Sequence, residues 1–316
     1  MNSRYKVVFA GMIGNALEFY DFSLYGFFAT ILASQFFPAG DRVAAIFYTF
    51  TVFGVGFLMR PLGAIVFGHI GDKYGRKIAL SLSVILMAVP TALIGVLPNY
   101  ATIGILAPII LTFCRLLQGL CTGGEYNGAA IFVIEHQKDK RGFAGGLITS
   151  SCAIGSLLGT LVGWFFSGYS ECFGIDAWRI PFIMGLVIGI IGLYTRHKLD
   201  ESPEFQEAVA RKKASGETTP DAPLLAALRK HLRSVICIIG IAWLNGVMYY
   251  STFTYVSVYL HNVFGWSLQS SLPMASLALL VYAIVTPLVG ALSDRVGEMR
   301  LMRPAALLIS LTAIPL

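Results

Sequence analysis

Gly68-His-Ile-Gly71-Asp72-Lys-Tyr-Gly75-Arg76-Lys77 lies between two long apolar runs and combines three cations, one carboxylate and three glycines. Glycine adopts backbone conformations that other residues avoid, so we expect Gly71 and Gly75 to permit a tight reversal of the chain. Basic residues between apolar runs are typical of loops on the cytoplasmic side of a membrane. The stretch therefore predicts a short cytoplasmic loop between two membrane-spanning helices.

A weaker copy of this stretch occupies residues 290–300. Three of its residues match the first copy at a constant displacement of 222 positions. They are Gly290, Asp294 and Gly297, which match Gly68, Asp72 and Gly75. Internal repeats of half-protein size are common in transporters, so the two copies predict two related halves.

The composition excludes an ordinary soluble domain. Apolar residues make up 56% of the chain and charged residues 13%, with a mean hydropathy of +0.72. We expect membrane spans at roughly residues 7–35, 43–67, 78–97, 103–132, 143–168, 179–195, 234–260 and 271–292, with a ninth starting near Pro304. The predicted fold class is an all-α integral membrane protein, a two-half helix bundle whose second half is incomplete.

These spans predict three parts of the chain. Residues 1–195 form a six-helix half, 196–233 a cytoplasmic linker and 234–316 part of a second half. Within the linker, Ser202-Pro203-Glu204 places a capping hydroxyl, a proline and an acid where a short helix would begin.

The net charge of +6 invites a nucleic-acid partner, but the distribution of the charge argues against one. All but four of the 23 Lys and Arg lie in segments that we place in the cytoplasm. The exceptions are Arg42, Arg60, Arg115 and Arg179. This bias predicts a multi-pass protein of the bacterial inner membrane with a cytoplasmic N-terminus. We expect it to contact lipid and to act as a monomer.

No arrangement of residues indicates an enzyme, a metal site or an organic cofactor. The five cysteines show no metal-ligand spacing. Nothing in the sequence pairs a nucleophile with a base or forms a phosphate-binding loop.

Span one carries Glu18 and Asp21, about 16 and 21 Å from its start and so near the middle of a ~30 Å hydrocarbon core. They share a small, polar helix face with Asn15 and Tyr25. Charge at that depth is costly and usually faces a cavity or a partner. Two roles fit these acids. They can handle solute or protons, or they can be structural, as members of a buried ion pair or as carboxyl groups that stay protonated.

Two arginines are candidate partners for these acids. Arg60 lies about 12 Å inside the loop, where it can snorkel to the headgroups or point inward as a counter-ion. Arg115 shares an arc of about 80° with Gln118, Thr122 and Glu125, because helical residues advance by about 100°. Such a polar stripe should line the interior, either to bind solute or to fix helix packing.

Span seven places Asn245 and Tyr249 on one helix face. Both side chains suit the binding of a polar solute. Packing explains them equally well.

Several of these stretches resemble a known family. Gly68–Lys77 is similar to the signature loop between helices two and three of the major facilitator superfamily, and residues 115–119 to its helix-four motif. Three more resemble the metabolite:proton symporter family, whose members carry proline and betaine, citrate, 2-oxoglutarate or shikimate. They are Gly14–Phe22, Phe57–Gly63 and Gly123–Tyr126. Residues 125–142 and 192–205 look most like the proline/betaine members.

The resemblance implies alternating access between two six-helix halves, driven by the proton-motive force. The positions that match family motifs are Glu18, Asp21, Arg60, Arg115 and Glu125, with Gly68, Asp72, Gly75, Arg76 and Asp294 in the gating loops. We expect a proton symporter for a small polar solute, with proline or glycine betaine as the first candidate. An organic carboxylate symporter, and a non-transporting sensor or relic on the same fold, are the alternatives.

The repeat also predicts where the second half would end. It places about a hundred residues of that half beyond Leu316, because counterparts of the last spans are not in the sequence. We expect the 316-residue chain to be a truncated or split-gene product that does not catalyse coupled uptake alone.

Overall fold

The computed structural model describes residues 3–38, 42–137, 139–202, 205–207, 209–211, 223–255, 264 and 268–312. These residues are almost entirely helical, as the sequence predicts. The chain divides into two compact units, one formed by Met1–Phe205 with Ala283–Leu316 and the other by Gln206–Tyr282.

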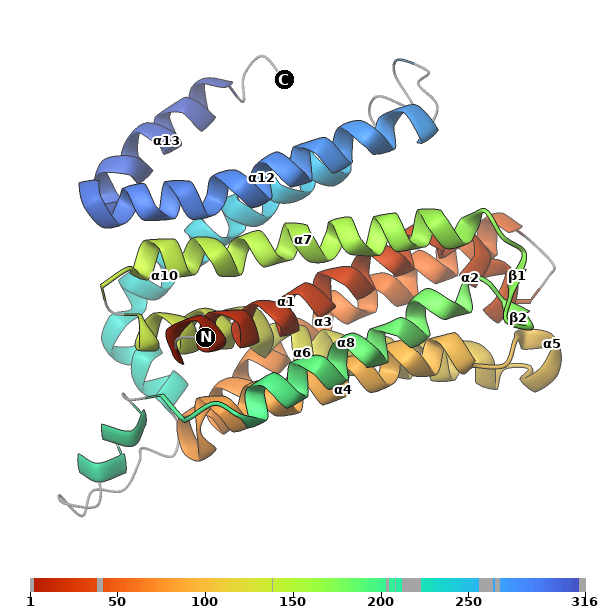
Figure 1. Ribbon diagram of the computed structural model, residues 1–316, viewed down its shortest axis with the longest axis horizontal. Coiled ribbons are helices and arrows are strands. Elements are labelled where there is room, and N and C mark those ends of the chain that lie inside the picture. The colour runs from red at the N-terminus through yellow and green to blue at the C-terminus, as the bar shows by residue number, and fades with distance from the viewer. Residues whose placement is uncertain are drawn as a thin grey trace. The chain divides into compact units, whose positions relative to one another are not determined.

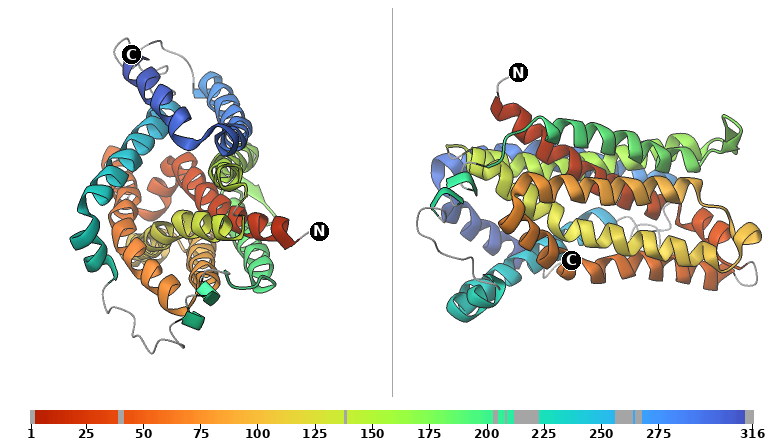
Figure 2. Two further views of the ribbon diagram at one scale, coloured as in Figure 1. Left: turned by 90° about the vertical axis from the view of Figure 1, so that its left-hand side faces the viewer. Right: turned by 90° about the horizontal axis from the view of Figure 1, so that it is seen from below.

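The long helices of the first unit run side by side (Figures 1 and 2). Its helices are α1 (Ser3–Phe27), α2 (Ala29–Phe36), α3 (Arg42–Tyr74), α4 (Arg76–Val96), α5 (Tyr100–Ile103), α6 (Leu106–His136), α7 (Arg141–Ser167), α8 (Arg179–His197) and α13 (Glu298–Thr312). A two-stranded antiparallel hairpin, β1 (Glu171–Cys172) and β2 (Ile175–Asp176), joins α7 to α8.

The second unit contains α10 (Pro223–Tyr250) and the π-helical turn η1 (Ser251–Tyr255). Helix α10 is kinked at His231, whose φ is −133°. The linker predicted at 196–233 therefore overlaps the end of α8 and the start of α10. Helix α12 (Leu268–Val296) begins in the second unit and ends in the first.

Only one residue of the predicted reversal lies outside a helix. Gly75 has a φ of +114°, in a region that favours glycine, and separates α3 from α4. Gly297, its match in the repeat, has a φ of +99° and separates α12 from α13. The prediction for Gly71 is wrong, because Gly71 lies inside α3. Its small size instead gives room to Arg76, whose Nη1 would lie 3.1 Å from an added Cβ.

Glycines let the helices of the first unit approach closely. A Cβ added at Gly63 of α3 would collide with the carbonyl oxygen of Leu120 on α6. A Cβ added at Gly119 of α6 would collide with the carbonyl oxygen of Gly56 on α3. Gly155 of α7 meets the backbone of α1 in the same way. Membrane helices often associate through such small residues, because lipid supplies no hydrophobic drive for helix association.

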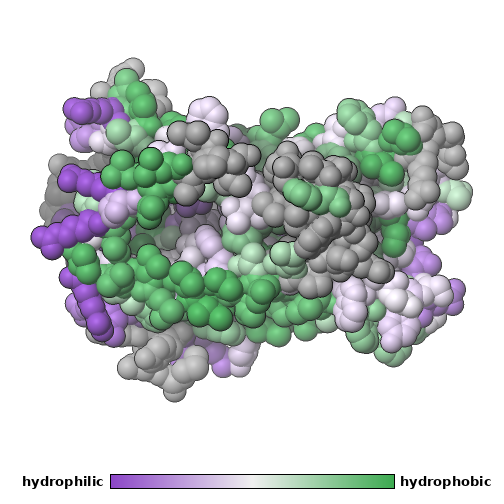
Figure 3. All heavy atoms as spheres, turned by 90° about the horizontal axis from the view of Figure 1, so that it is seen from above, coloured by the Kyte–Doolittle hydropathy of each residue, from purple (hydrophilic) through white to green (hydrophobic). Residues whose placement is uncertain are grey.

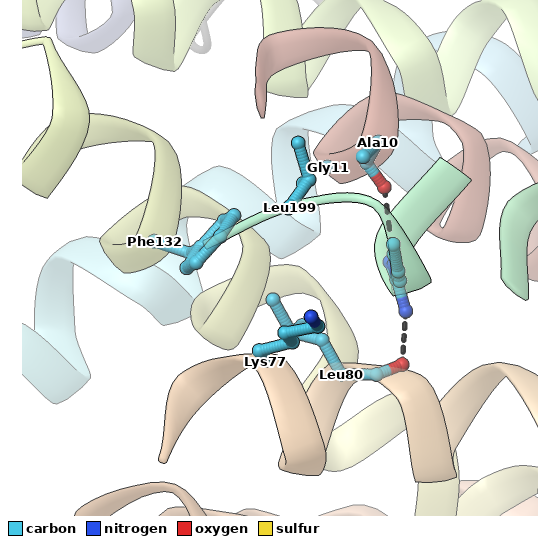
Figure 4. A pocket seen from close by; sticks show the side chains of 7 residues that line it. Ala10, Gly11, Lys77, Leu80, Phe132 and Leu199 are labelled. Atoms are coloured by element: carbon cyan, nitrogen blue, oxygen red, sulfur yellow. Dashed lines mark hydrogen bonds between the residues drawn. The ribbon is translucent and has the colours of Figure 1, made fainter. Parts of the chain in front are cut away.

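Arg196 corrects the sequence analysis, which placed it at the start of a cytoplasmic linker. It lies in the last turn of α8 and is 2% exposed. Its guanidinium donates to the carbonyl oxygens of Ala10, at 3.1 Å, and Leu80 (Figure 4), and it pairs with Glu125. These contacts join α1, α4, α6 and α8. The depression beside them is too narrow to hold a water molecule.

Large apolar side chains lie on the surface, as expected for a protein in lipid. Figure 3 shows them on one face, with hydrophilic side chains gathered mainly at the left-hand end and fewer at the right-hand end. Seven helices in the described part of the chain are long and apolar enough to cross a membrane. Helix α1 is not one of the seven, and it packs against α4, α6, α7 and α8.

Replacing Arg196 with methionine should lower the free energy of unfolding by about 3–5 kcal/mol, because Glu125 keeps a buried charge without its cation. Arg196→Met combined with Glu125→Leu should recover most of that loss, since no uncompensated charge remains. Thermal unfolding in detergent measures both variants. A single variant as stable as the unmodified chain would show that Arg196 does not hold these helices together.

Candidate functional site

Asp21 is fully buried in the first unit and is held by donors from two other helices. Arg115 Nη1 of α6 lies 2.6 Å from its Oδ2. Gln118 Nε2 of α6 and Thr91 Oγ1 of α4 donate to its Oδ1 at 2.8 and 2.9 Å. The sequence predicts Asp21, Arg115 and Gln118 on interior faces. It gives no sign of Thr91, because a single threonine in an apolar span is commonplace.

Arg115 retains unused hydrogen-bonding capacity in this buried place. Its guanidinium carbon lies 3.7 Å from the centroid of the Tyr25 ring, and Tyr25 Oη donates to the carbonyl of Thr49 at 3.0 Å. The Nε and Nη2 atoms of Arg115 are buried and have no hydrogen-bond partner among the described residues. Unsatisfied buried donors are costly, so they mark a position where a ligand acceptor would be stabilised.

Glu18 and Arg60 form a second, looser acid–guanidinium pair. Arg60 Nη2 of α3 lies 3.8 Å from Glu18 Oε1. Glu18 is buried, and its Oε2 has no hydrogen-bond partner within the described ranges. The Arg60 guanidinium lies over the rings of Phe22 and Phe57. Of the two orientations considered for Arg60, the structure has the inward one.

Glu125 belongs to a different cluster from the other acids. Its carboxylate pairs with Arg196 and accepts a hydrogen bond from Ser83 of α4. Both partners escape sequence reasoning, because Arg196 stands at the end of an apolar run and Ser83 is one of two serines in α4. Glu125 therefore faces a compact structural cluster, whereas Asp21 and Glu18 face groups with unused capacity.

The two copies of the repeated loop make different contacts. Asp72 pairs with Arg76 one turn later, at 2.8 Å, and is largely exposed. Asp294 accepts from the backbone N–H groups of Gly142 and Phe143 at the start of α7, at 2.6 and 2.9 Å. A carboxylate at a helix N-terminus is stabilised by the helix dipole and by the unpaired N–H groups.

Glu201 makes the matching contact at the start of α4, and the sequence analysis did not single it out. Its carboxylate accepts from the backbone N–H of Arg76 at 3.0 Å and of Lys77 at 3.1 Å.

Gly68 lies inside α3, and Gly75 lies just before α4.

Asn245 and Tyr249 lie on α10 in the second unit. Asn245 is exposed. Tyr249 packs its ring against Phe253 and Tyr282, with ring centroids 4.9 and 5.9 Å apart. Among the described residues, no group of three or more His, Cys, Asp or Glu is arranged to hold a metal ion.

Known proteins resemble the chain over nearly its whole length. It is 39% identical to a proline/betaine transporter of Salmonella typhimurium and 38% identical to one of Escherichia coli, each over 98% of this chain and 63% of the relative. It is 36% identical to a glycine betaine/proline/ectoine/pipecolic acid transporter of Dickeya dadantii, over 93% of this chain and 60% of that protein. The chain thus spans less than two thirds of the length of these relatives.

The fold has solved counterparts. The xylose transporter XylE from E. coli, in a partially occluded inward open conformation, superimposes with a TM-score of 0.68 at 15% identity, over 94% of this chain and 72% of that one. Residues 11–316 match the Major Facilitator Superfamily. The chain is therefore a multi-pass membrane protein that belongs to the major facilitator superfamily.

Proposed function

We propose that the chain serves proton-coupled uptake of a small zwitterionic solute, proline or glycine betaine, across a bacterial inner membrane. One observation carries the proposal: beside Asp21, the buried Arg115 keeps two donors that have no hydrogen-bond partner among the described residues. A carboxylate is the acceptor that a guanidinium binds best, because planar N–H groups match its two oxygens. Arg115 is therefore proposed to bind the carboxylate of the solute.

The acids near Arg115 favour a zwitterion over a plain anion. Asp21 and Glu18 both lie on α1 within one turn of each other, and each is paired with one guanidinium. A solute that brought only negative charge would leave an excess of carboxylates in a buried place, which is costly. A zwitterion brings its own cation. The names of the relatives, which are transporters of proline and betaine, agree with this choice.

Uptake of labelled proline by the purified chain in lipid vesicles tests the proposal. With an imposed inward proton gradient, the vesicles should accumulate proline, and an uncoupler should abolish the accumulation. This outcome would contradict the expectation from the repeat that the 316-residue chain does not catalyse coupled uptake alone. Excess glycine betaine should compete, whereas citrate and 2-oxoglutarate should not. Competition by citrate alone would instead favour an organic carboxylate symporter. Binding of proline without accumulation would leave a solute-binding protein that does not carry out transport.

Glu18 is the stronger candidate for carrying the coupled proton. Its one cationic partner among the described residues, Arg60, lies 3.8 Å away, whereas Asp21 is held by three donors within 3 Å. Glu18→Gln should therefore abolish gradient-driven accumulation while changing the Kd of proline less than about tenfold. The exposed Glu171→Gln is the matched control and should leave accumulation unchanged. Full accumulation by Glu18→Gln would remove this residue from the coupling mechanism.

Asp294 is proposed to hold one conformation of the gate by its contact with the start of α7. Asp294→Ala removes the acceptor for two N–H groups, so it should slow uptake several-fold without changing solute affinity. Initial rates of uptake and equilibrium binding on the same vesicles separate these effects. If the variant inserts normally and its rate is unaltered, the loop has no gating role.

A further inference from the structure

Four aromatic rings form a cluster between α1 and α3, next to both buried acids. Phe22 and Tyr25 come from α1, and Phe53 and Phe57 from α3. The Phe22 ring centroid lies 5.5 Å from those of Phe53 and Phe57, and the Phe53 centroid lies 5.4 Å from those of Phe57 and Tyr25. Helical spacing explains the cluster, because residues three or four apart lie on the same helix face.

The faces of these rings already hold two cations. The guanidinium carbon of Arg60 lies 4.7 Å from the Phe22 centroid and 4.4 Å from that of Phe57. The guanidinium carbon of Arg115 lies 3.7 Å from the Tyr25 centroid. All three distances fall within the ~6 Å over which a cation is attracted to a ring face. The cluster is thus suited to positive charge as well as to packing.

The two guanidinium groups differ in how firmly they are held. Arg115 is 1% exposed and lies 2.6 Å from its carboxylate. The Arg60 side chain is 28% exposed, lies 3.8 Å from Glu18, and has a buried Nε without a hydrogen-bond partner among the residues described. Arg60 also has a long side chain that can move its head group toward water. It is therefore the cation that a solute can displace.

We propose that Phe22 and Phe57, with Glu18 beside them, form a cage for the quaternary ammonium group of a solute such as glycine betaine. The ammonium takes the place of the Arg60 guanidinium, and the solute carboxylate binds the unpartnered N–H groups of Arg115. This inference rests on the proposed function and names the solute class that the site prefers.

The chemistry of a quaternary ammonium supports the choice of rings. It carries no N–H group, so hydrogen-bond acceptors alone recognise it poorly. Ring faces attract its charge while tolerating its apolar methyl groups, and aromatic cages bind such groups in other proteins. A carboxylate such as that of Glu18 adds charge without requiring a donor.

Equilibrium binding to the full chain in lipid vesicles tests the cage with two ligands of one shape. Tert-butylacetate has the carboxylate and the three methyl groups of glycine betaine, but a neutral carbon replaces the nitrogen. The unmodified chain should bind glycine betaine more tightly than tert-butylacetate. Phe22→Leu and Phe57→Leu should each reduce that preference by about 2- to 30-fold, because leucine keeps apolar volume but has no ring face.

Two controls accompany these variants. Phe57→Tyr keeps the ring and should keep the preference. Phe27→Leu changes a half-buried ring of α1 that packs against Phe28 and should also keep it.

The possible outcomes separate the cage from the proposed function. The cage is overturned if the leucine variants keep the full preference for glycine betaine over tert-butylacetate, or if they lose the binding of both ligands equally. In either case the rings only pack, and zwitterion binding by Arg115 stands. If the unmodified chain binds neither ligand, the proposed function fails and the cage fails with it.

Discussion

The ion pair between Asp21 of α1 and Arg115 of α6 is the interaction on which the interior of the first unit depends. Both groups are out of contact with solvent, where an uncompensated charge would be costly. The pair persists because Gln118 and Thr91 supply further donors. These contacts fix α1, α4 and α6 in one register. The glycine contacts between α3 and α6 then bring Arg60 and the aromatic rings to the same place.

Two kinds of buried charge coexist in this unit, and the quality of their pairing separates them. Arg196 meets one carboxylate and two backbone carbonyls, so its donors are used within the protein. Arg115 and Glu18 keep buried atoms without partners in the described part of the chain. A fully satisfied cluster stabilises helix packing. An incompletely satisfied cluster invites a ligand, which is the physical basis for placing the solute near Arg115.

Sequence reasoning reached the fold because hydrophobic runs and one repeated loop are local signals. The match of Gly75 to Gly297 was visible as a fixed displacement, and both residues have positive φ. Periodicity also placed Arg115 on an interior face. Periodicity could not identify the partners of the buried acids, because these partners lie far away in the sequence. Arg196 contacts Glu125 across 71 positions, and Thr91 contacts Asp21 across 70. The prediction for Gly71 was wrong because a glycine beside a turn can allow close packing instead of a reversal of the chain.

The central claim is that the Asp21–Arg115 pair binds solute and is not only a structural pair. Replacing both members, Asp21→Leu with Arg115→Met, tests this most directly. Thermal unfolding should change less than in either single variant, because no uncompensated charge remains. Glycine betaine binding should be lost, whereas the same exchange at Glu125 and Arg196 should preserve it. A folded Asp21→Leu, Arg115→Met variant that binds glycine betaine with the affinity of the unmodified chain would contradict the account.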